Sequence, residues 1–252
     1  MIAWLAPKGL GDAIYLRALV LHSLGEQQIV FTLWDDVFYG LEGVEIRPLS
    51  EVAREHEYRL SHAFYCLHCK MPELGRLSQF QMMCRQGGVT DDVELRLGWS
   101  AQNKKLLRRV RGAADGRPIL LYQMPKRPRN IEQSLLAPDM NAFVDAVRSR
   151  DEFFRVRVGS SRFCDDVECP REYDLFDNTT VSDLLDLTEV ADRFLSEPCY
   201  LSVVAQAVDK PFECMFSRRG LASNYPKISG VTPERLFHKP HLGTALYDGG
   251  CK

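Results

Sequence analysis

Long apolar runs are missing from this sequence. Lys8, Asp12 and Arg17 interrupt the apolar stretch at the N-terminus, and no segment reaches the ~20 apolar residues that a membrane-spanning helix needs. The same charges break up the continuous apolar core that a secretory signal peptide requires. We therefore expect a cytoplasmic protein with no integral membrane association.

An excess of charge of one sign is also missing. The chain has 32 Lys and Arg residues against 34 Asp and Glu residues, and its formal net charge is -2. This balance gives no general attraction to nucleic acid or anionic lipid and leaves room only for a local basic patch. The segment KKLLRRVR, within residues 100–117, is the candidate for such a patch. The favoured alternative is a solvated helix face that leads into a linker.

Several catalytic motifs are absent as well. The chain has no GxSxG elbow, HExxH pair, Walker A loop or kinase motif set, so hydrolase triads and P-loop chemistry have little support. The eight cysteines are scattered, as free thiols are in a cytoplasmic chain. His62, Cys66, His68 and Cys69 have the residue types and close spacing of zinc ligands. Because a structural zinc site usually needs a second paired element, we expect no metal site.

Alternating strand and helix patterns fill the first part of the chain. Hydrophobic residues make up 45% of the 252 residues, enough for one large core or two smaller ones. Apolar runs predict strands at 1–7, 28–34, 44–49 and 58–67, and helical spacing predicts helices at about 12–24 and 71–88.

The composition changes at residues 100–117, which are polar, basic and end in a Gly-Arg-Pro turn, as is typical of an interdomain linker. Beyond it the pattern restarts, with strands predicted at 118–124, 153–160, 192–197 and 212–217 and helices at 139–150, 179–191 and 199–208. We predict an α/β fold of two Rossmann-like parallel-sheet domains that face a cleft. The predicted divisions are an acceptor-side domain at 1–112, a donor domain at 113–240 and a tail at 241–252.

Ligands of such sheets bind outside the carboxyl ends of the strands, and three segments of this kind stand out. In the first, GLGD, Gly9 and Gly11 permit a tight turn and close approach of a ligand, and Asp12 begins a helix. A carboxylate there is stabilised by the helix dipole and points into the cleft, or it only caps the helix.

The second segment follows the strand at 118–124 and contains Lys126, Arg127 and Arg129. Arginine offers bidentate hydrogen bonds to phosphate and lysine a compact charge, so these residues are candidates for phosphate binding. The alternative is a solvated basic loop.

The third segment spans residues 192–220. A strand ends at Ser196 and Glu197, and a helix begins near Cys199, where free N–H groups favour an anion. Glu197 is a candidate to accept hydrogen bonds from ribose hydroxyls. Arg218 follows the next strand and is expected to reach the same cleft. Groups suited to binding phosphate therefore follow three separate predicted strands, and this convergence favours a nucleotide site in the cleft.

Two stretches resemble the family 9 glycosyltransferases, which include the ADP-heptose:lipopolysaccharide heptosyltransferases. One is KGLGDAIYLRAL, and the other is DLFDNTTVSDLLDLTEVADRFLSEPCYLSVVAQAVDKPFECMFS. The resemblance implies a GT-B fold that binds a nucleotide-sugar donor mainly through its C-terminal domain, with no metal and no further cofactor. It places the base for the acceptor hydroxyl at Asp12 and the phosphate-binding lysine near Lys126, with Arg127 or Arg129 as substitutes.

The sequence departs from the family at the donor-binding helix start. Pro198, Cys199 and Tyr200 stand where the family carries Asp-Thr-Gly, and Val203 stands at its histidine. Cys199 and Tyr200 are therefore the donor-site candidates at this helix. The resulting hypothesis is metal-independent transfer of a sugar to a hydroxyl of a glycan, a small metabolite or a modified nucleic-acid base. The alternatives are a non-catalytic nucleotide or nucleotide-sugar binding protein and a metabolic α/β enzyme that shares only the fold.

Overall fold

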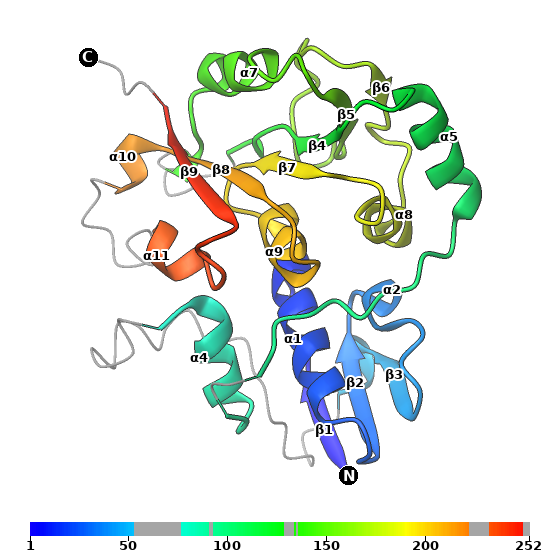
Figure 1. Ribbon diagram of the computed structural model, residues 1–252. Helices are drawn as coiled ribbons and strands as arrows, with labels where there is room; N and C mark the ends of the chain where they lie inside the picture. Colours follow the sequence, from blue (N-terminus) through cyan, green and yellow to red (C-terminus); the bar gives the residue numbers. More distant parts are fainter. Residues whose placement is uncertain (53–76, 91–92, 129–133, 135, 222–231, 249–252) are drawn as a thin grey trace.

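Two parallel sheets organise the chain in the computed structural model, which describes residues 1–52, 77–90, 93–128, 134, 136–221 and 232–248 (Figure 1). The smaller sheet has the order β1-β2-β3, formed by Ile2–Leu5, Gln28–Thr32 and Val44–Pro48. The larger has the order β6-β5-β4-β7-β8-β9. Its strands are β4 (Ile119–Gln123), β5 (Phe154–Val158), β6 (Tyr173–Asp174), β7 (Arg193–Ser196), β8 (Phe212–Phe216) and β9 (Gly243–Tyr247).

The central strands are apolar along their whole length because both of their faces are covered. Every residue of β4 and β8 is buried, which is typical of strands inside a parallel sheet. The helical elements are α1 (Leu10–His22), α2 (Asp35–Phe38), η1 (Leu49–Glu51), α4 (Gln79–Gln86), α5 (Lys104–Ala114), α7 (Met140–Arg148), α8 (Val181–Leu187), α9 (Tyr200–Ala207), α10 (Arg218–Leu221) and α11 (Pro233–Leu236). Among these described elements, none is a helix long and apolar enough to cross a membrane.

Helices α1 and α9 lie between the two sheets and pack against each other (Figure 1). One hydrophobic cluster includes Trp4 and Leu19 from the first part of the chain and Val204 and Phe212 from the second. A Cβ on Gly11 would lie 3.3 Å from Cα of Tyr200, so the starts of the two helices nearly touch. The two sheets therefore share a continuous core.

The prediction of a linker at residues 100–117 needs correction. The buried carboxylate of Asp186, on α8, accepts hydrogen bonds from Trp99 Nε1 at 2.7 Å and from the backbone nitrogens of Gln102 and Asn103. Leu106 and Val110 are buried, and α5 packs on α8. The segment is thus an amphipathic helix whose basic side faces solvent, and a domain boundary at residue 112 would fall inside it.

The prediction of a tail from residue 241 is also wrong in part, because β9 pairs in parallel with β8 and forms one edge of the larger sheet. The carboxylate of Asp248 then accepts hydrogen bonds from the backbone nitrogens of Asp139 and Arg218, both at 2.9 Å. The residues of this edge strand are half-buried or exposed, so the strand lacks the continuous apolar run that would have predicted it from the sequence. The strand predicted at 58–67 lies outside the described residues.

Candidate active site

A cavity of about 640 Å³ opens between the two sheets, at the carboxyl ends of β1, β4, β5 and β7. This is where a ligand was expected from the strand order. The α1 side contributes Lys8, Gly9, Leu10, Gly11, Asp12, Tyr15 and Trp34. The side of the larger sheet contributes Gln123, Lys126, Arg127, Gly159, Ser160, Phe163, Cys164, Thr179, Val181, Leu184, Glu197, Pro198, Cys199, Tyr200 and Val203, and Gln79, Leu136, Ala137 and Leu236 complete the lining.

Asp12 stands in the first turn of α1 and lines the cavity, and the residue is 9% exposed. The N-cap position belongs to Gly9, in extended backbone, so Asp12 is not the N-cap of this helix. A Cβ on Gly9 would lie 2.5 Å from Oδ2 of Asp12. Glycine at position 9 therefore leaves the space that the carboxylate occupies, close to the positive end of the helix dipole.

Trp34 is a cavity residue that the sequence analysis missed. Its indole Nε1 donates a hydrogen bond to the backbone oxygen of Lys8 at 2.9 Å, which fixes the ring beside the start of α1. The sequence feature that could have identified Trp34 is its position just after the buried strand β2. Residues at that position lie at the same edge of the sheet as Asp12.

Lys126 and Arg127 follow β4 and both line the cavity, as expected. The backbone nitrogen of Arg127 donates to the oxygen of Phe163 at 2.7 Å, and its guanidinium forms an exposed ion pair with Asp165 at 2.6 Å. The guanidinium of Arg127 is therefore already paired with a carboxylate, and Lys126 is the better candidate for binding an anion. Arg129 lies outside the described residues.

Glu197 ends the segment after β7 with its carboxyl buried at the cavity, only 6% exposed. Its Oε1 accepts a hydrogen bond from the backbone nitrogen of Lys126 at 3.0 Å, so two of the predicted segments meet here. Burial raises the pKa of Glu197 to about 7, although the charge and the backbone N–H of Lys126 act in the opposite direction.

Cys199 and Tyr200 begin α9 beside this carboxyl. The thiol of Cys199 accepts a hydrogen bond from the backbone nitrogen of Leu201 at 3.4 Å, so it caps the helix. Burial raises the pKa of the Cys199 thiol and the pKa of the Tyr200 hydroxyl above their ordinary values. Both groups are therefore neutral. The donor-site candidates are thus present at the cavity as uncharged groups.

The turn after β5 forms a further wall that the sequence analysis did not assign. Gly159 has a φ of +132°, a conformation that favours glycine, and Ser160, Phe163 and Cys164 follow it along the cavity. Phe163 remains 39% exposed at the rim. The Gly-Ser pair at the end of a predicted strand was the signal for this turn.

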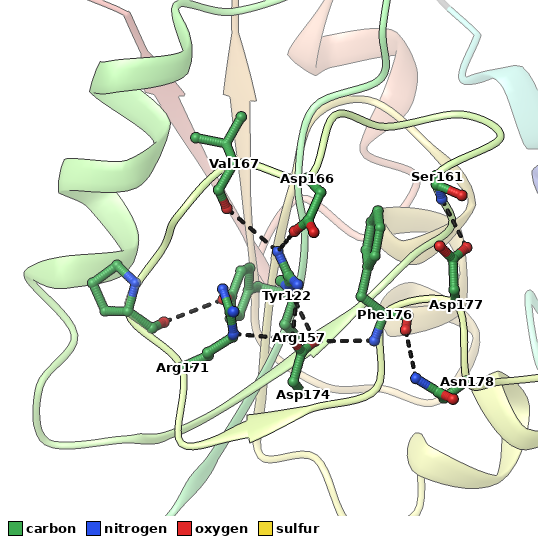
Figure 2. Close-up of polar contacts among 11 residues, drawn as sticks. Tyr122, Arg157, Ser161, Asp166, Val167, Arg171, Asp174, Phe176, Asp177 and Asn178 are labelled. Carbon is green, nitrogen blue, oxygen red and sulfur yellow. Dashed lines mark hydrogen bonds and ion pairs between the residues drawn. The ribbon is translucent and has the colours of Figure 1, made fainter.

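Arg157 holds the loop behind this turn in place (Figure 2). Its buried guanidinium binds both carboxylate oxygens of Asp174, at 2.9 and 2.7 Å, and Oδ1 of Asp166 at 2.7 Å. It also lies over the ring of Phe176, 4.6 Å from the centroid. This bidentate pair within a larger network fixes both ends of the loop that carries Phe163.

Ser196 and Arg218 do not line the cavity, in contrast to the prediction. Ser196 is buried within β7, and Arg218 begins α10 after β8, one strand further from the cavity. His62, Cys66, His68 and Cys69 lie outside the described residues. In the part of the chain that is described, no three His, Cys, Asp or Glu side chains gather as metal ligands would.

Comparison with known proteins finds likeness in structure but not in sequence. No protein-family model and no curated protein sequence matches the chain. A family 9 glycosyltransferase from Veillonella parvula superposes with a TM-score of 0.63 at 10% identity, over 98% of this chain and 85% of that one. The ADP-heptose lipopolysaccharide heptosyltransferase II of E. coli gives a TM-score of 0.54 at 11% identity, over 98% and 92%.

The dodecameric, iron-containing glycosyltransferase TibC from enterotoxigenic E. coli is a third structural neighbour. Its TM-score is 0.56 at 12% identity, over 85% of this chain and 59% of that one. Identities this low carry information on the fold alone. The chain therefore has a GT-B-like α/β fold with parallel sheets, as the family 9 glycosyltransferases and heptosyltransferases have.

Proposed function

We propose that the protein is a glycosyltransferase that moves a sugar from a nucleoside diphosphate to an acceptor hydroxyl. The observation that carries the proposal is the cavity itself, which places the Asp12 carboxylate on one wall and Lys126 on another. The fold supports it, because the structural neighbours are glycosyltransferases and one TibC structure contains ADP-D-beta-D-heptose.

In the proposed reaction Asp12 accepts the proton of the acceptor hydroxyl, whose oxygen attacks the anomeric carbon of the sugar. The bond from that carbon to the diphosphate breaks, and its electron pair leaves on the phosphate oxygen. Lys126 stabilises the charge that develops there, as an oxyanion hole does for other leaving groups. The buried cavity walls reduce the access of water, which would otherwise hydrolyse the donor.

A test of this function begins with a thermal-shift screen against nucleoside diphosphates and nucleotide-sugars, with and without EDTA. A ligand that binds only the folded protein raises the melting temperature by mass action. We expect a nucleotide-sugar to stabilise the protein equally in both conditions, since the proposed site uses no metal. The absence of a shift with every nucleotide would contradict the proposal, and a shift that EDTA abolishes would contradict metal independence.

The role of Asp12 is tested by Asp12→Ala. The variant should bind the nucleotide nearly as tightly as the wild type, because the phosphate contacts come from the other wall of the cavity. Transfer should fall at least about 100-fold, the usual contribution of a general base. Release of the nucleoside diphosphate from the donor, assayed with candidate acceptors, measures this. Unchanged turnover would remove Asp12 from the mechanism.

A second candidate function is nucleotide or nucleotide-sugar binding without catalysis. The start of α9 favours it, because Pro198, Cys199 and Tyr200 replace the Asp-Thr-Gly of the resembling family and Cys199 is already used as a helix cap. Tight binding of a nucleotide-sugar with no turnover for any acceptor would support this function over transfer.

A third candidate function is transfer of the sugar to a nucleic-acid base, which the basic surface of α5 favours. Lys104, Lys105, Arg108 and Arg109 are exposed on α5, and α8, on which α5 packs, also lines the cavity. Binding of DNA that weakens steeply with salt, and that falls when these four residues are replaced by glutamine, would support a nucleic-acid acceptor.

A further inference from the structure

The two oxygens of the Glu197 carboxyl have different surroundings. Oε1 accepts the hydrogen bond from the backbone nitrogen of Lys126 at 3.0 Å. Oε2 receives no hydrogen bond from any residue that the structure describes, although Glu197 lines the cavity. Oε2 is not one of the fully buried atoms that lack a partner, so it is accessible from the cavity, and a ligand there is an available partner for it.

The groups that face Glu197 offer little compensation for a negative charge. Among the described residues, the cation that acts on it is Lys126, after β4, and Arg127 in the same segment is engaged with Asp165. Its other titratable neighbours in this described part of the chain are the thiols of Cys164 after β5, Cys199 at the start of α9 and Cys214 on β8. Burial raises the pKa of each thiol, so all three are neutral.

We propose that Glu197 binds a diphosphate oxygen of the ligand as a neutral carboxylic acid, so that the protein takes up a proton when it binds a nucleoside diphosphate. The proposal rests on the proposed function, since it requires a diphosphate beside Lys126. An ionised carboxylate would repel that diphosphate, whereas a protonated one donates an O–H hydrogen bond from Oε2. Lys126 and Glu197 then bind the same group, one as a cation and the other as a neutral donor.

This proposal differs from the expectation that Glu197 accepts hydrogen bonds from ribose hydroxyls. Contact with ribose uses the ionised form, which more alkaline solution favours. Contact with phosphate uses the neutral form, which alkaline solution removes. The burial of Glu197, which raises the pKa of its carboxyl to about 7, puts the difference in an accessible pH range.

The experiment is isothermal titration calorimetry of the full chain with ADP, UDP, GDP and inorganic pyrophosphate, in EDTA, from pH 6.0 to 8.5. Two buffers of different ionisation enthalpy at each pH give the number of protons taken up. Pyrophosphate has no ribose, so it isolates the phosphate contact. The matched variant is Glu197→Gln, which keeps an oxygen for the Lys126 N–H and offers an NH₂ donor in place of the acid O–H.

For the wild type we expect uptake approaching one proton at pH 8 and an affinity that falls about tenfold per pH unit above pH 7. Titration of the ligand's own phosphate affects both proteins equally, so the difference between them reports Glu197. The variant should show no such uptake and should bind about 30-fold more tightly than the wild type at pH 8.5, the loss expected 1.5 pH units above the pKa of Glu197. Pyrophosphate should behave like the nucleotides.

The possible outcomes separate this proposal from the proposed function. If the wild type binds a nucleotide but the variant loses affinity at every pH, Glu197 contacts ribose and the proposal is overturned. Equal pH dependence of the wild type and the variant overturns it as well. If the wild type binds neither nucleotides nor pyrophosphate at any pH, the proposed function fails together with it.

Discussion

Glu197 combines burial at the cavity with a raised carboxyl pKa, and this shift also affects the stability of the fold. Its pKa is raised by burial to about 7 from an ordinary value of 4.5, so the folded protein holds this proton more tightly than the unfolded chain. The stability from this group is fully present below pH 4.5 and is lost as the pH rises through 7.

We therefore expect the free energy of unfolding of the wild type to fall, relative to Glu197→Gln, as the pH is raised from 5.5 to 8.5. Over this range the expected difference is on the order of 2 kcal/mol, since one pKa unit corresponds to about 1.4 kcal/mol and part of the loss has already occurred at pH 5.5. Urea denaturation of both proteins at several pH values measures it. Parallel pH dependence of the two would mean that Glu197 is ionised in the folded protein.

Among the helices, α1 and α9 meet at a point where glycine is required for a structural reason. A Cβ on Gly11 would lie 3.3 Å from Cα of Tyr200 and 3.4 Å from a methyl carbon of Val203. The sequence analysis attributed Gly9 and Gly11 to close approach of a ligand. In the structure the two glycines also make room for the Asp12 carboxylate and for the start of α9.

Gly11→Ala should therefore lower the free energy of unfolding by about 1–3 kcal/mol, because the added methyl group forces the two helix starts apart. Gly112→Ala is the matched control, since Gly112 is exposed in α5 with no atom within 4 Å of its added Cβ. The control should gain about 0.5–1 kcal/mol from helix propensity. Urea denaturation midpoints measure both, and effects of equal sign and size would contradict a close contact at Gly11.

At the scale of the whole molecule, the shared core has a consequence for unfolding. The larger hydrophobic cluster runs from β1 through α1 and α9 to β8 and joins the two sheets, while a second, smaller cluster packs β4 against α7 within the larger sheet's part of the chain. A chain of two domains joined by a free linker would be expected to unfold in two steps, whereas a shared core favours one cooperative step.

The tryptophans make this testable without labels. All three, Trp4, Trp34 and Trp99, belong to the first 99 residues, whereas far-UV circular dichroism reports helices in both parts of the chain, such as α1 and α7. We expect the urea transitions followed by tryptophan fluorescence and by circular dichroism to coincide. Two separated transitions would show that the sheets unfold independently. A saturating nucleoside diphosphate should shift both signals together, because its site takes residues from both sides of the cavity.

The order of the elements and the segments that carry the site follow from local sequence patterns. Strands such as β4 and β8 are buried on both faces and are therefore apolar throughout, which makes them readable as local patterns. The start of α8 is equally local, since Thr180 and Asp183 form a reciprocal capping box. Gly9, Asp12, Lys126 and Glu197 follow predicted strands, and strand ends mark the ligand edge of a parallel sheet.

Contacts between segments distant in the chain govern which of these residues reach the cavity and which charge they carry there. Ser196 and Arg218 also stand at strand ends, but side-chain direction and strand order keep both from the cavity. Packing of α5 on α8 and pairing of β9 with β8 depend on partners distant in the chain, so segment composition misled both predictions. The shifted pKa of Glu197 is likewise a product of tertiary packing. Its pKa depends on the burial supplied by neighbours from other strands, which no local pattern specifies.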